Sequence, residues 1–463
     1  MVEDKCIQEE LHGSGSIRES LPMEYEEQDY YEEKHKALIK RILGSEIQID
    51  SPIVVPVLYG DLMTWALHRQ IEEAGFKIIK TEGYRNRAPV YADVDSGCGS
   101  KQNLLKRGVL VLEKQGEFLI VTMDSNSDEP STLTVTGPER IKTIVTGFAD
   151  AVVEIMKKRN FYRGRKIELS YRISFIDVPV RSWDDLVLDN EIKNDIRENT
   201  IDFLANKDRL KEFGVPCKRG VLMVGAPGCG KTLACKLLLS EAPKGVTCIT
   251  TVPGLMEDHR YLHWLYRIAE DLSPSIVFIE DVDLIAQERR FMRSPALLTL
   301  LSMLDGVEER DGVITVATTN DLETIDKAIS KRPARFDRII HFEKPRLKQR
   351  TDLILRLCRN IPLDVHTQSY LAKKTDNFTP AQILEVIYSL AIDYCQNNEG
   401  PKPSCITCSK QGVDNAIVKI NRDNKQLGIG FSLSANRNAE NYDVPIHTDN
   451  EIKSEGENKN VYI

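Results

Sequence analysis

The spacing of apolar residues predicts an α+β region in the first third of the chain. Residues 61–74 repeat apolar positions at helical intervals, and residues 76–80 suit a strand. Gly116 separates two runs rich in Val, Leu and Ile, residues 108–113 and 117–123. This arrangement favours a two-stranded hairpin with its turn at the glycine.

A second helix is expected over residues 138–159, because a proline is favoured at a helix start and the apolar residues that follow recur at helical spacing. One face should be buried against the hairpin or a neighbouring subunit, through Ile141, Ile144, Phe148, Val152 and Ile155. Together these elements predict a smaller α+β domain over residues 36–175. No catalytic or metal-binding spacing stands out within it.

The pattern changes near residue 181, where short apolar runs alternate with helical segments and the turns become rich in glycine. Such alternation is typical of a parallel α/β sheet, which we predict over residues 181–345. Residues 346–423 have mainly helical periodicity, clearest at 353–358 and 383–394, and are expected to form a helical lid.

Both ends of the chain have compositions that bury little apolar surface. Residues 1–35 contain a Gly-Ser-Gly segment and the acidic run 23–33, which predicts a flexible acidic leader. Residues 424–463 are rich in Asn, Asp, Glu, Lys and Ser and are expected to be a polar tail.

Composition narrows the classes of function. Of 463 residues, 62 are Lys or Arg and 70 are Asp or Glu, and the net charge of −8 makes a nucleic-acid partner unlikely on physical grounds. No secretory signal and no apolar run of about 20 residues are visible, which predicts a cytoplasmic chain without a membrane span. The ten cysteines are scattered, as expected for reduced thiols, and the lone Cys405/Cys408 pair lacks the second pair of a zinc site.

A phosphate-binding loop is predicted between an apolar strand at 221–224 and a helix at 233–239. Its residues have the pattern G-x-x-x-x-G-K-T and are Gly225, Ala226, Pro227, Gly228, Cys229, Gly230, Lys231 and Thr232. Such a loop turns successive backbone N–H groups towards phosphate oxygens, and the helix that follows adds its positive dipole end. Lys231 is expected to neutralise the β- and γ-phosphates, and the Thr232 hydroxyl to bind Mg²⁺.

A second apolar strand, residues 276–279, ends in Glu280 and Asp281. An acid at such a strand end can hold the Mg²⁺ ion that Thr232 also binds, while its neighbour orients the attacking water. Solvated acids at a strand end are the alternative, but the position of the pair about fifty residues after the loop favours a catalytic role.

These motifs occur in an order that resembles an AAA-clade ATPase module over roughly residues 183–380. A third apolar strand, residues 313–317, precedes Asn320, which matches the family's sensor 1 and implies a residue that orients the water. Arg332 and Arg335 match the family's arginine fingers, which act in the nucleotide site of an adjacent subunit. Leu186 and Leu188 lie in a segment similar to the one whose backbone brackets adenine. The resemblance implies ATP and Mg²⁺ as cofactors and a homo-oligomer, expected to be a hexameric ring.

Two departures from the family pattern qualify that resemblance. Typical members have Asp then Glu where this chain has Glu280 then Asp281; the order is similar to that of the mitochondrial Rieske-protein translocase group and predicts slower hydrolysis. Residues 251–254 lack the aromatic residue that protein-threading members have in the pore loop. Residues 378–382 lack a sensor 2 arginine, as typical members do; an arginine there would have suggested replication-initiator or clamp-loader relatives. After the pore-loop segment, three aromatic residues have the spacing of a helix whose apolar side is buried: Tyr261, Trp264 and Tyr266.

Two functions follow as hypotheses. In the first, Mg-ATP hydrolysis at subunit interfaces of a ring remodels or translocates a protein partner held by residues 36–175. In the second, the chain is an ATP-gated assembly scaffold with very slow hydrolysis. The predicted fold is α/β, a P-loop NTPase parallel sheet with a helical lid, preceded by a smaller α+β domain.

Overall fold

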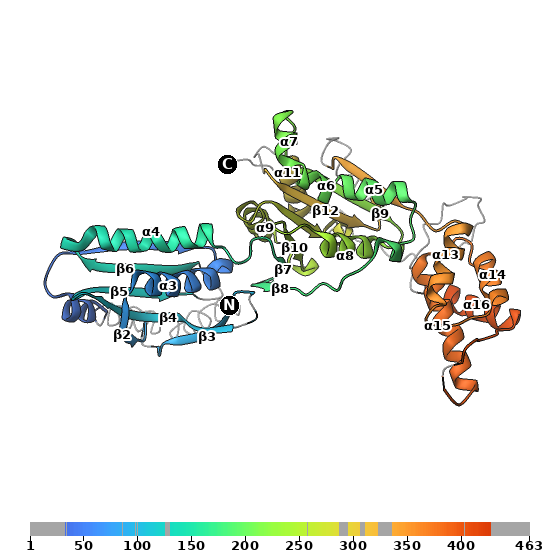
Figure 1. The fold of residues 1–463 in the computed structure, drawn as a ribbon, viewed down its shortest axis with the longest axis horizontal. Coiled ribbons are helices and arrows are strands. Elements are labelled where there is room, and N and C mark those ends of the chain that lie inside the picture. Colours follow the sequence, from blue (N-terminus) through green and yellow to red (C-terminus); the bar gives the residue numbers. More distant parts are fainter. Residues whose placement is uncertain are drawn as a thin grey trace, which may run out of the picture.

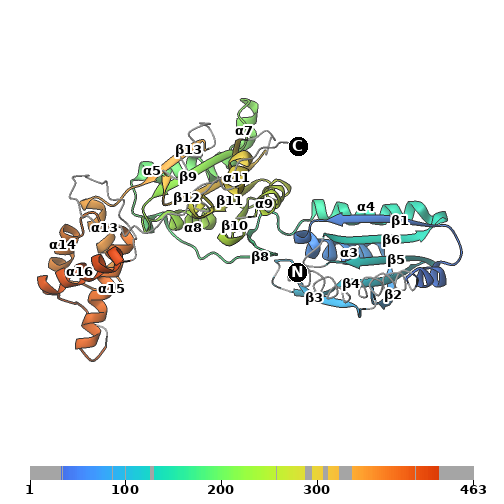
Figure 2. The same cartoon turned by 180° about the vertical axis from the view of Figure 1, so that it is seen from behind.

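The computed structural model describes residues 33 and 35–426, with gaps at 86, 98, 100, 126–129, 257, 287–294, 306–310, 323–335 and 402. Most of the predicted leader and most of the predicted tail therefore lie outside the described residues. Three parts follow one another in a row, with the amino-terminal sheet and the helical lid at opposite ends and a central sheet between them (Figures 1 and 2).

The amino-terminal part is built on a six-stranded antiparallel sheet with the order β1-β6-β5-β4-β2, in which β3 also pairs with β4. Its strands are β1 (Gln48–Val55), β2 (Lys77–Glu82), β3 (Val90–Asp95), β4 (Lys101–Lys114), β5 (Glu117–Asp124) and β6 (Ser131–Pro138). The predicted hairpin is confirmed as β4 and β5, which pair from Arg107–Asp124 to Lys114–Glu117 around the Gly116 turn.

Alternation along β4 and β5 gives this sheet two buried faces. Leu110 and Val121 face one core together with the helices α3 (Gly60–Ala74) and α4 (Lys142–Lys158), which pack against each other. Val109 and Ile120 belong to a second, smaller core, to which the helical residues 35–43 contribute. Both predicted helices are confirmed.

One position on α4 departs from the prediction. Ile144 is 44% exposed, whereas its neighbour Val145 is fully buried against the sheet. The short 3-10 turn Glu139–Ile141 precedes the α-helix, so helical spacing does not run unbroken from Ile141. The other four residues of the predicted stripe are buried.

The central sheet has seven strands in the order β13-β9-β12-β11-β10-β7-β8. They are β7 (Lys166–Leu169), β8 (Ile173–Phe175), β9 (Arg219–Gly225), β10 (Thr247–Thr251), β11 (Ser275–Ile279), β12 (Val313–Thr319) and β13 (Arg338–Phe342). All neighbours pair in parallel except β7 and β8. The predicted strands at 221–224, 276–279 and 313–317 and the predicted fold class are thereby confirmed.

The division predicted at residue 175 does not coincide with the edge of this sheet. Strands β7 and β8 lie within residues 36–175, yet β7 pairs with β10 from Lys166–Cys248 to Leu169–Thr251. The last ten residues of the predicted amino-terminal domain therefore extend the central sheet. Parallel pairing across some eighty residues leaves no local signal in so short a strand.

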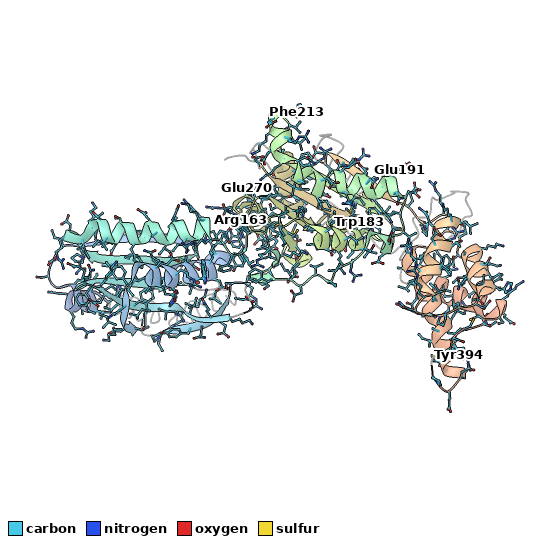
Figure 3. The ribbon with its side chains drawn as sticks, in the orientation of Figure 1. Arg163, Trp183, Glu191, Phe213, Glu270 and Tyr394 are labelled. Carbon is cyan, nitrogen blue, oxygen red and sulfur yellow. The ribbon has the colours of Figure 1, made fainter. Side chains whose placement is uncertain are left out.

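The amino-terminal and central parts meet in an aromatic cluster formed by the buried Tyr162 and the partly buried Trp65, Phe161 and Phe175. Beside it, Tyr59 donates to Asp271 at 3.1 Å, and Arg163 donates to the main-chain oxygen of Asp271 at 2.7 Å. Figure 3 shows Arg163 at this junction. Asp271 ends helix α9 (His259–Asp271) of the central part, so the junction is fixed by both apolar and polar contacts.

The remaining helices of the central part cover the two faces of its sheet. They are α5 (Asn190–Glu198), α6 (Ile201–Ala205), α7 (Lys207–Glu212), α8 (Lys231–Glu241), α10 (Val282–Ala286) and α11 (Pro295–Asp305). Strand β11 is buried at every position because helices pack on both of its sides. This explains why its sequence is an unbroken apolar run.

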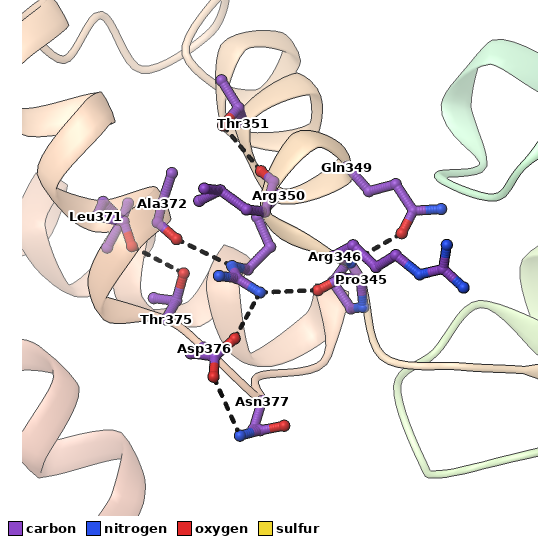
Figure 4. Close-up of polar contacts among 11 residues, drawn as sticks. Pro345, Arg346, Gln349, Arg350, Thr351, Leu371, Ala372, Thr375, Asp376 and Asn377 are labelled. Atoms are coloured by element: carbon purple, nitrogen blue, oxygen red, sulfur yellow. Dashed lines mark hydrogen bonds and ion pairs between the residues drawn. The ribbon is translucent and has the colours of Figure 1, made fainter.

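The lid is a four-helix unit with its own hydrophobic core. Its helices are α13 (Leu347–Leu357), α14 (Val365–Lys374), α15 (Pro380–Asn397) and α16 (Lys410–Gln426), so α16 continues three residues into the predicted tail. Arg350 is buried and joins the lid to the segment that leads into it (Figure 4). It donates to the carbonyls of Ala372 at 2.9 Å and Pro345 at 3.0 Å, and pairs with Asp376 at 2.9 Å.

Two predictions about composition can be compared with the described residues. None of the described helices has the length and apolar character needed to cross a bilayer. Cys405 and Cys408 are both free thiols, and the described part of the chain contains no cluster of three or more His, Cys, Asp or Glu side chains suited to a metal ion.

Candidate nucleotide site

The predicted phosphate loop connects β9 to α8 at the carboxyl edge of the central sheet. Gly228 and Gly230 have φ angles of +80° and +102°, which glycine adopts without strain. A side chain at Gly225 would place its Cβ 2.4 Å from the carbonyl oxygen of Phe342 on β13, so the loop passes too close to the next strand for any other residue. The loop therefore curls tightly over the start of α8.

Lys231, the first residue of α8, points back into this loop. Its ammonium donates to the carbonyls of Gly225 at 2.6 Å and Ala226 at 3.2 Å, and to the side-chain oxygen of Asn320 at 2.8 Å. The residue is only 5% exposed, and burial lowers the pKa of its amine. All three acceptors are neutral, so a cation is held here without an anion bonded to it.

Thr232 and Glu280 bring two hard oxygen donors together. The Thr232 hydroxyl donates to the Glu280 carboxylate at 2.8 Å, although 48 residues separate them in the chain. The contact arises because β9 and β11 end at the same edge of the sheet, with β12 between them. Both predicted metal-binding residues therefore lie side by side.

Asp281 and Asn320 form the other polar pair of the site. The Asn320 amide donates to Asp281 at 3.0 Å while its oxygen accepts from Lys231. Asp281 has a left-handed backbone with φ of +52°, and the Thr318 hydroxyl accepts from its main-chain N–H at 3.0 Å. One amide thus connects the lysine to the acid predicted to orient water.

The comparisons with known proteins agree with this geometry. The model of the family "ATPase family associated with various cellular activities (AAA)" matches residues 221–344. A proteasome-activating nucleotidase of Sulfurisphaera tokodaii is 30% identical over 296 residues, which are 60% of this chain and 71% of the relative. This chain belongs to the AAA family of ATPases.

Two further relatives match over shorter stretches. The ATPase family gene 2 protein of Saccharomyces cerevisiae is 30% identical over 225 residues, 45% of this chain and 28% of that protein. The ATP-dependent zinc metalloprotease FtsH 2 of a Thermoanaerobacter strain is 31% identical over 203 residues, 42% of this chain and 39% of that protein. The chain spans well under half the length of these two relatives.

The segment predicted to bracket adenine lies where the phosphate loop, the rest of the central part and the lid meet. Leu186 is buried, and its side chain lies 2.8 Å from the place a Cβ would take on Gly230. Val187 packs against the lid core, and Leu188 against the core of the central part. Trp183, just before this segment, lies on the side of the central part that is nearer the lid (Figure 3).

The lid also touches the phosphate loop directly. The main-chain N–H of Ala381, at the start of α15, donates to the carbonyl of Gly228 at 3.2 Å. A Cβ on Gly228 would lie 2.7 Å from that of Ala381, so the contact is tight. The segment 378–382, which lacks a sensor 2 arginine, thus meets the loop through a small residue and the backbone.

The donor set fits ATP with magnesium. The concave loop, the helix start and the buried Lys231 suit a polyphosphate, for which they supply N–H groups and one positive charge. Thr232 and Glu280 offer two oxygen ligands, which is what Mg²⁺ takes from proteins when phosphates and waters complete its shell.

Burial also raises the pKa of the Cys229 thiol in this loop, so Cys229 stays protonated and is not a nucleophile near neutral pH.

The other predicted site residues differ in their outcome. Arg332 and Arg335 lie outside the described residues. Tyr261 and Tyr266 are buried in α9, as predicted, whereas Trp264 on the same helix is 45% exposed. The predicted buried side of α9 is thus narrower than the three aromatic positions suggested.

Asp283 is a residue of this site that the sequence analysis missed. It is buried on α10, where its Oδ1 accepts from the Thr319 hydroxyl at 3.0 Å and from the main-chain N–H of Asn320 at 3.1 Å. It therefore fixes the backbone that carries Asn320. The available signal was an acid two residues after Asp281 at the start of a helix, where an acid is also common for reasons of the helix dipole.

Changing Asp283 to leucine is expected to lower kcat for ATP at least about tenfold while ATP affinity changes less than about threefold. The partly buried main-chain N–H of Asn320 loses an acceptor, at a cost of ~1–3 kcal/mol, and the Thr319 hydroxyl keeps only its bond to the carbonyl of Asp321, so Asn320 shifts. Asp283→Asn keeps an oxygen at the same place and is expected to retain most of the activity. Steady-state kinetics and nucleotide titration of both variants check this. An unchanged kcat in Asp283→Leu would contradict the positioning role.

Proposed function

We propose that this AAA chain binds Mg-ATP at the carboxyl edge of the central sheet and hydrolyses it at interfaces between copies of itself. The single observation that carries the proposal is the continuous polar network from Lys231 through Asn320 to Asp281, with the Thr232–Glu280 pair beside it. A buried lysine with a purely structural role is usually paired with a carboxylate, whereas Lys231 bonds to neutral oxygens. A triphosphate would supply anionic oxygens for this amine, whose hydrogen bonds to described residues all go to neutral oxygens.

Each side chain takes a role from its contacts. Lys231 binds phosphate oxygens and keeps them at the loop, and Thr232 with Glu280 holds the magnesium, which when bound neutralises charge on the phosphates. Asp281 orients a water molecule and accepts its proton, while Asn320 holds both that carboxylate and Lys231 in place. The lid and Leu186 close the loop from the adenine side.

Assembly enters the proposal through Arg332 and Arg335. In the role implied by the AAA motif they reach the nucleotide of an adjacent copy, so that a ring, expected to be a hexamer, is the active form. Hydrolysis of the bound nucleotide would then depend on contact between neighbouring copies.

We further propose that turnover acts on a protein partner held by the amino-terminal part, residues 36–175. Two relatives support this, because their names couple nucleotides to protein degradation: one is a proteasome-activating nucleotidase and another an ATP-dependent metalloprotease. The junction between the two parts supports it too, since Tyr59 and Arg163 fix the amino-terminal part to the end of α9. Movement of the central part would therefore carry the partner domain with it.

An ATP-gated scaffold is the second candidate. The exchanged order of Glu280 and Asp281 favours it, because the shorter acid stands where water must be oriented, and its carboxylate already accepts from Asn320. In that case assembly depends on ATP while turnover is negligible.

The test is ATP turnover by the purified chain as its concentration rises. We expect a rate per chain that increases as copies assemble, a loss of at least about 100-fold in Arg332→Ala, and ATP affinity within about threefold of wild type, because an arginine finger stabilises phosphoryl transfer and not ground-state binding. Arg359→Ala, an exposed lid arginine, is the matched control. ATP-dependent assembly with no turnover at any concentration would favour the scaffold and refute hydrolysis.

A further inference from the structure

A cavity of about 600 Å³ lies in the amino-terminal part, far from the nucleotide site. One wall is the helical segment 35–43, and the other is the turn that follows β2. The polar and aromatic side chains that line it are His35, Arg41, Glu82, Tyr84, Arg85 and Arg87. No role has been assigned to this cavity so far.

Both walls are firmly held, so the cavity is a built feature of the fold. Leu38, Ile39 and Leu43 pack the helical segment onto Val109 and Ile120 of the sheet. The turn is closed by two hydrogen bonds between Tyr84 and Arg87, at 3.1 and 3.2 Å. A cavity that keeps its shape can bind a ligand without a large ordering cost.

The lining carries more positive than negative charge. Glu82 pairs with Arg41 at 3.2 Å and with Lys80, and these pairs hold the pKa of the Glu82 carboxyl below its usual value. Arg85 and Arg87 are exposed and have no carboxylate partner among the residues that the structure describes. Arg85 lies over the ring of Tyr84, 5.2 Å from its centre. Two arginines are therefore available for an anionic ligand.

The chain itself contains a segment of complementary chemistry that ends, in the sequence, shortly before the residues that line the cavity. Residues 23–32 read Met-Glu-Tyr-Glu-Glu-Gln-Asp-Tyr-Tyr-Glu, with five acids, three tyrosines and no basic residue. This run ends three residues before His35, which lines the cavity. A ten-residue stretch spans at most ~35 Å when extended, and each part of it can reach the cavity. Acids suit the two arginines, and tyrosine rings stack on guanidinium groups.

We propose that the acidic leader segment, residues 23–32, occupies this arginine-lined cavity in cis. Tethering gives the segment an effective concentration of about 1 mM, which exceeds that of most partners in solution. The leader thereby covers a surface of the partner-binding domain, and an acidic segment of another protein would have to displace it. The inference concerns residues 23–88 alone and does not depend on ATP hydrolysis.

The test uses the full chain and a fluorescent peptide with the sequence of residues 22–33. In one variant all five acids of residues 23–32 become amides: Glu24→Gln, Glu26→Gln, Glu27→Gln, Asp29→Asn and Glu32→Gln. Fluorescence anisotropy is expected to show the peptide binding this variant at least about tenfold more tightly than wild type, because the competing segment in cis is weakened. Added salt should weaken the binding.

Two further chains make the result decisive. Arg85→Ala with Arg87→Ala, in the amide background, is expected to lose at least about tenfold in peptide affinity. Arg359→Ala in that background is the control and should bind like its parent, and thermal melting checks that each chain is folded. Equal affinity of wild type and the amide variant would overturn the proposal. A loss with the arginine pair alone would then assign the cavity to an acidic segment of another protein.

Discussion

Replacing Lys231 by methionine is expected to weaken ATP binding by at least about 100-fold, which corresponds to roughly 3 kcal/mol. In the proposed role the Lys231 ammonium, which lies in the loop, would pair with the phosphates, and hydrogen bonds to charged groups are about twice as strong as neutral ones. Isothermal titration with a slowly hydrolysed ATP analogue measures the loss. Turnover should fall to background in the same variant.

The same change is expected to leave the melting temperature of the nucleotide-free chain unchanged or raised. Burial lowers the pKa of Lys231, so the folded chain holds this cation at a cost in free energy, which methionine removes. Lys236→Met is the matched control, since Lys236 is exposed on the same helix. Wild-type affinity in Lys231→Met would contradict the proposed nucleotide site, and weakened binding in Lys236→Met would point to a general effect on α8.

The sequence was sufficient for those parts of the site that depend on local patterns. A parallel strand covered on both faces is an unbroken apolar run, so β9, β11 and β12 could be read directly, as could the residues at their ends. Because parallel strands end at one edge, the proximity of Lys231, Glu280 and Asn320 followed from three separate motifs. Their hydrogen bonds confirm that proximity, while their catalytic roles remain predictions.

Long-range contacts could not be predicted in the same way. Strand β7 has four residues, and its pairing with β10 depends on how the amino-terminal part docks, which no periodicity in residues 166–169 encodes. Asp283 was missed for a similar reason. Its two donors are Thr319, the last residue of β12, and Asn320, which follows it, and both are more than thirty positions from Asp283 in the sequence. Acids at helix starts are common, so the residue type alone did not distinguish it.

Glu280 and Asp281, the acids in exchanged order, can be assigned different roles because each has a different hydrogen-bond partner. Glu280 accepts from Thr232, the predicted magnesium ligand, whereas Asp281 accepts from Asn320, which also holds Lys231. From these contacts we propose that the longer acid holds the metal and the shorter one orients the water. Amide variants keep the shape of each side chain and remove its charge, so they separate the two roles.

Asp281→Asn is expected to lower kcat at least about 100-fold with ATP affinity within about threefold of wild type, because an amide still fits beside Asn320 but cannot accept a proton from water. Glu280→Gln is expected to raise the Mg²⁺ concentration needed for half-maximal turnover about tenfold, since one anionic ligand is lost. Turnover measured across a magnesium series, with ATP affinity measured in parallel, compares both variants.

The reverse result, with Glu280→Gln abolishing turnover at every magnesium concentration and Asp281→Asn shifting only the magnesium dependence, would exchange the two roles. A wild-type rate already at background would leave the Asp281→Asn variant nothing to lower and would select the scaffold, because the acids would then serve nucleotide-dependent assembly.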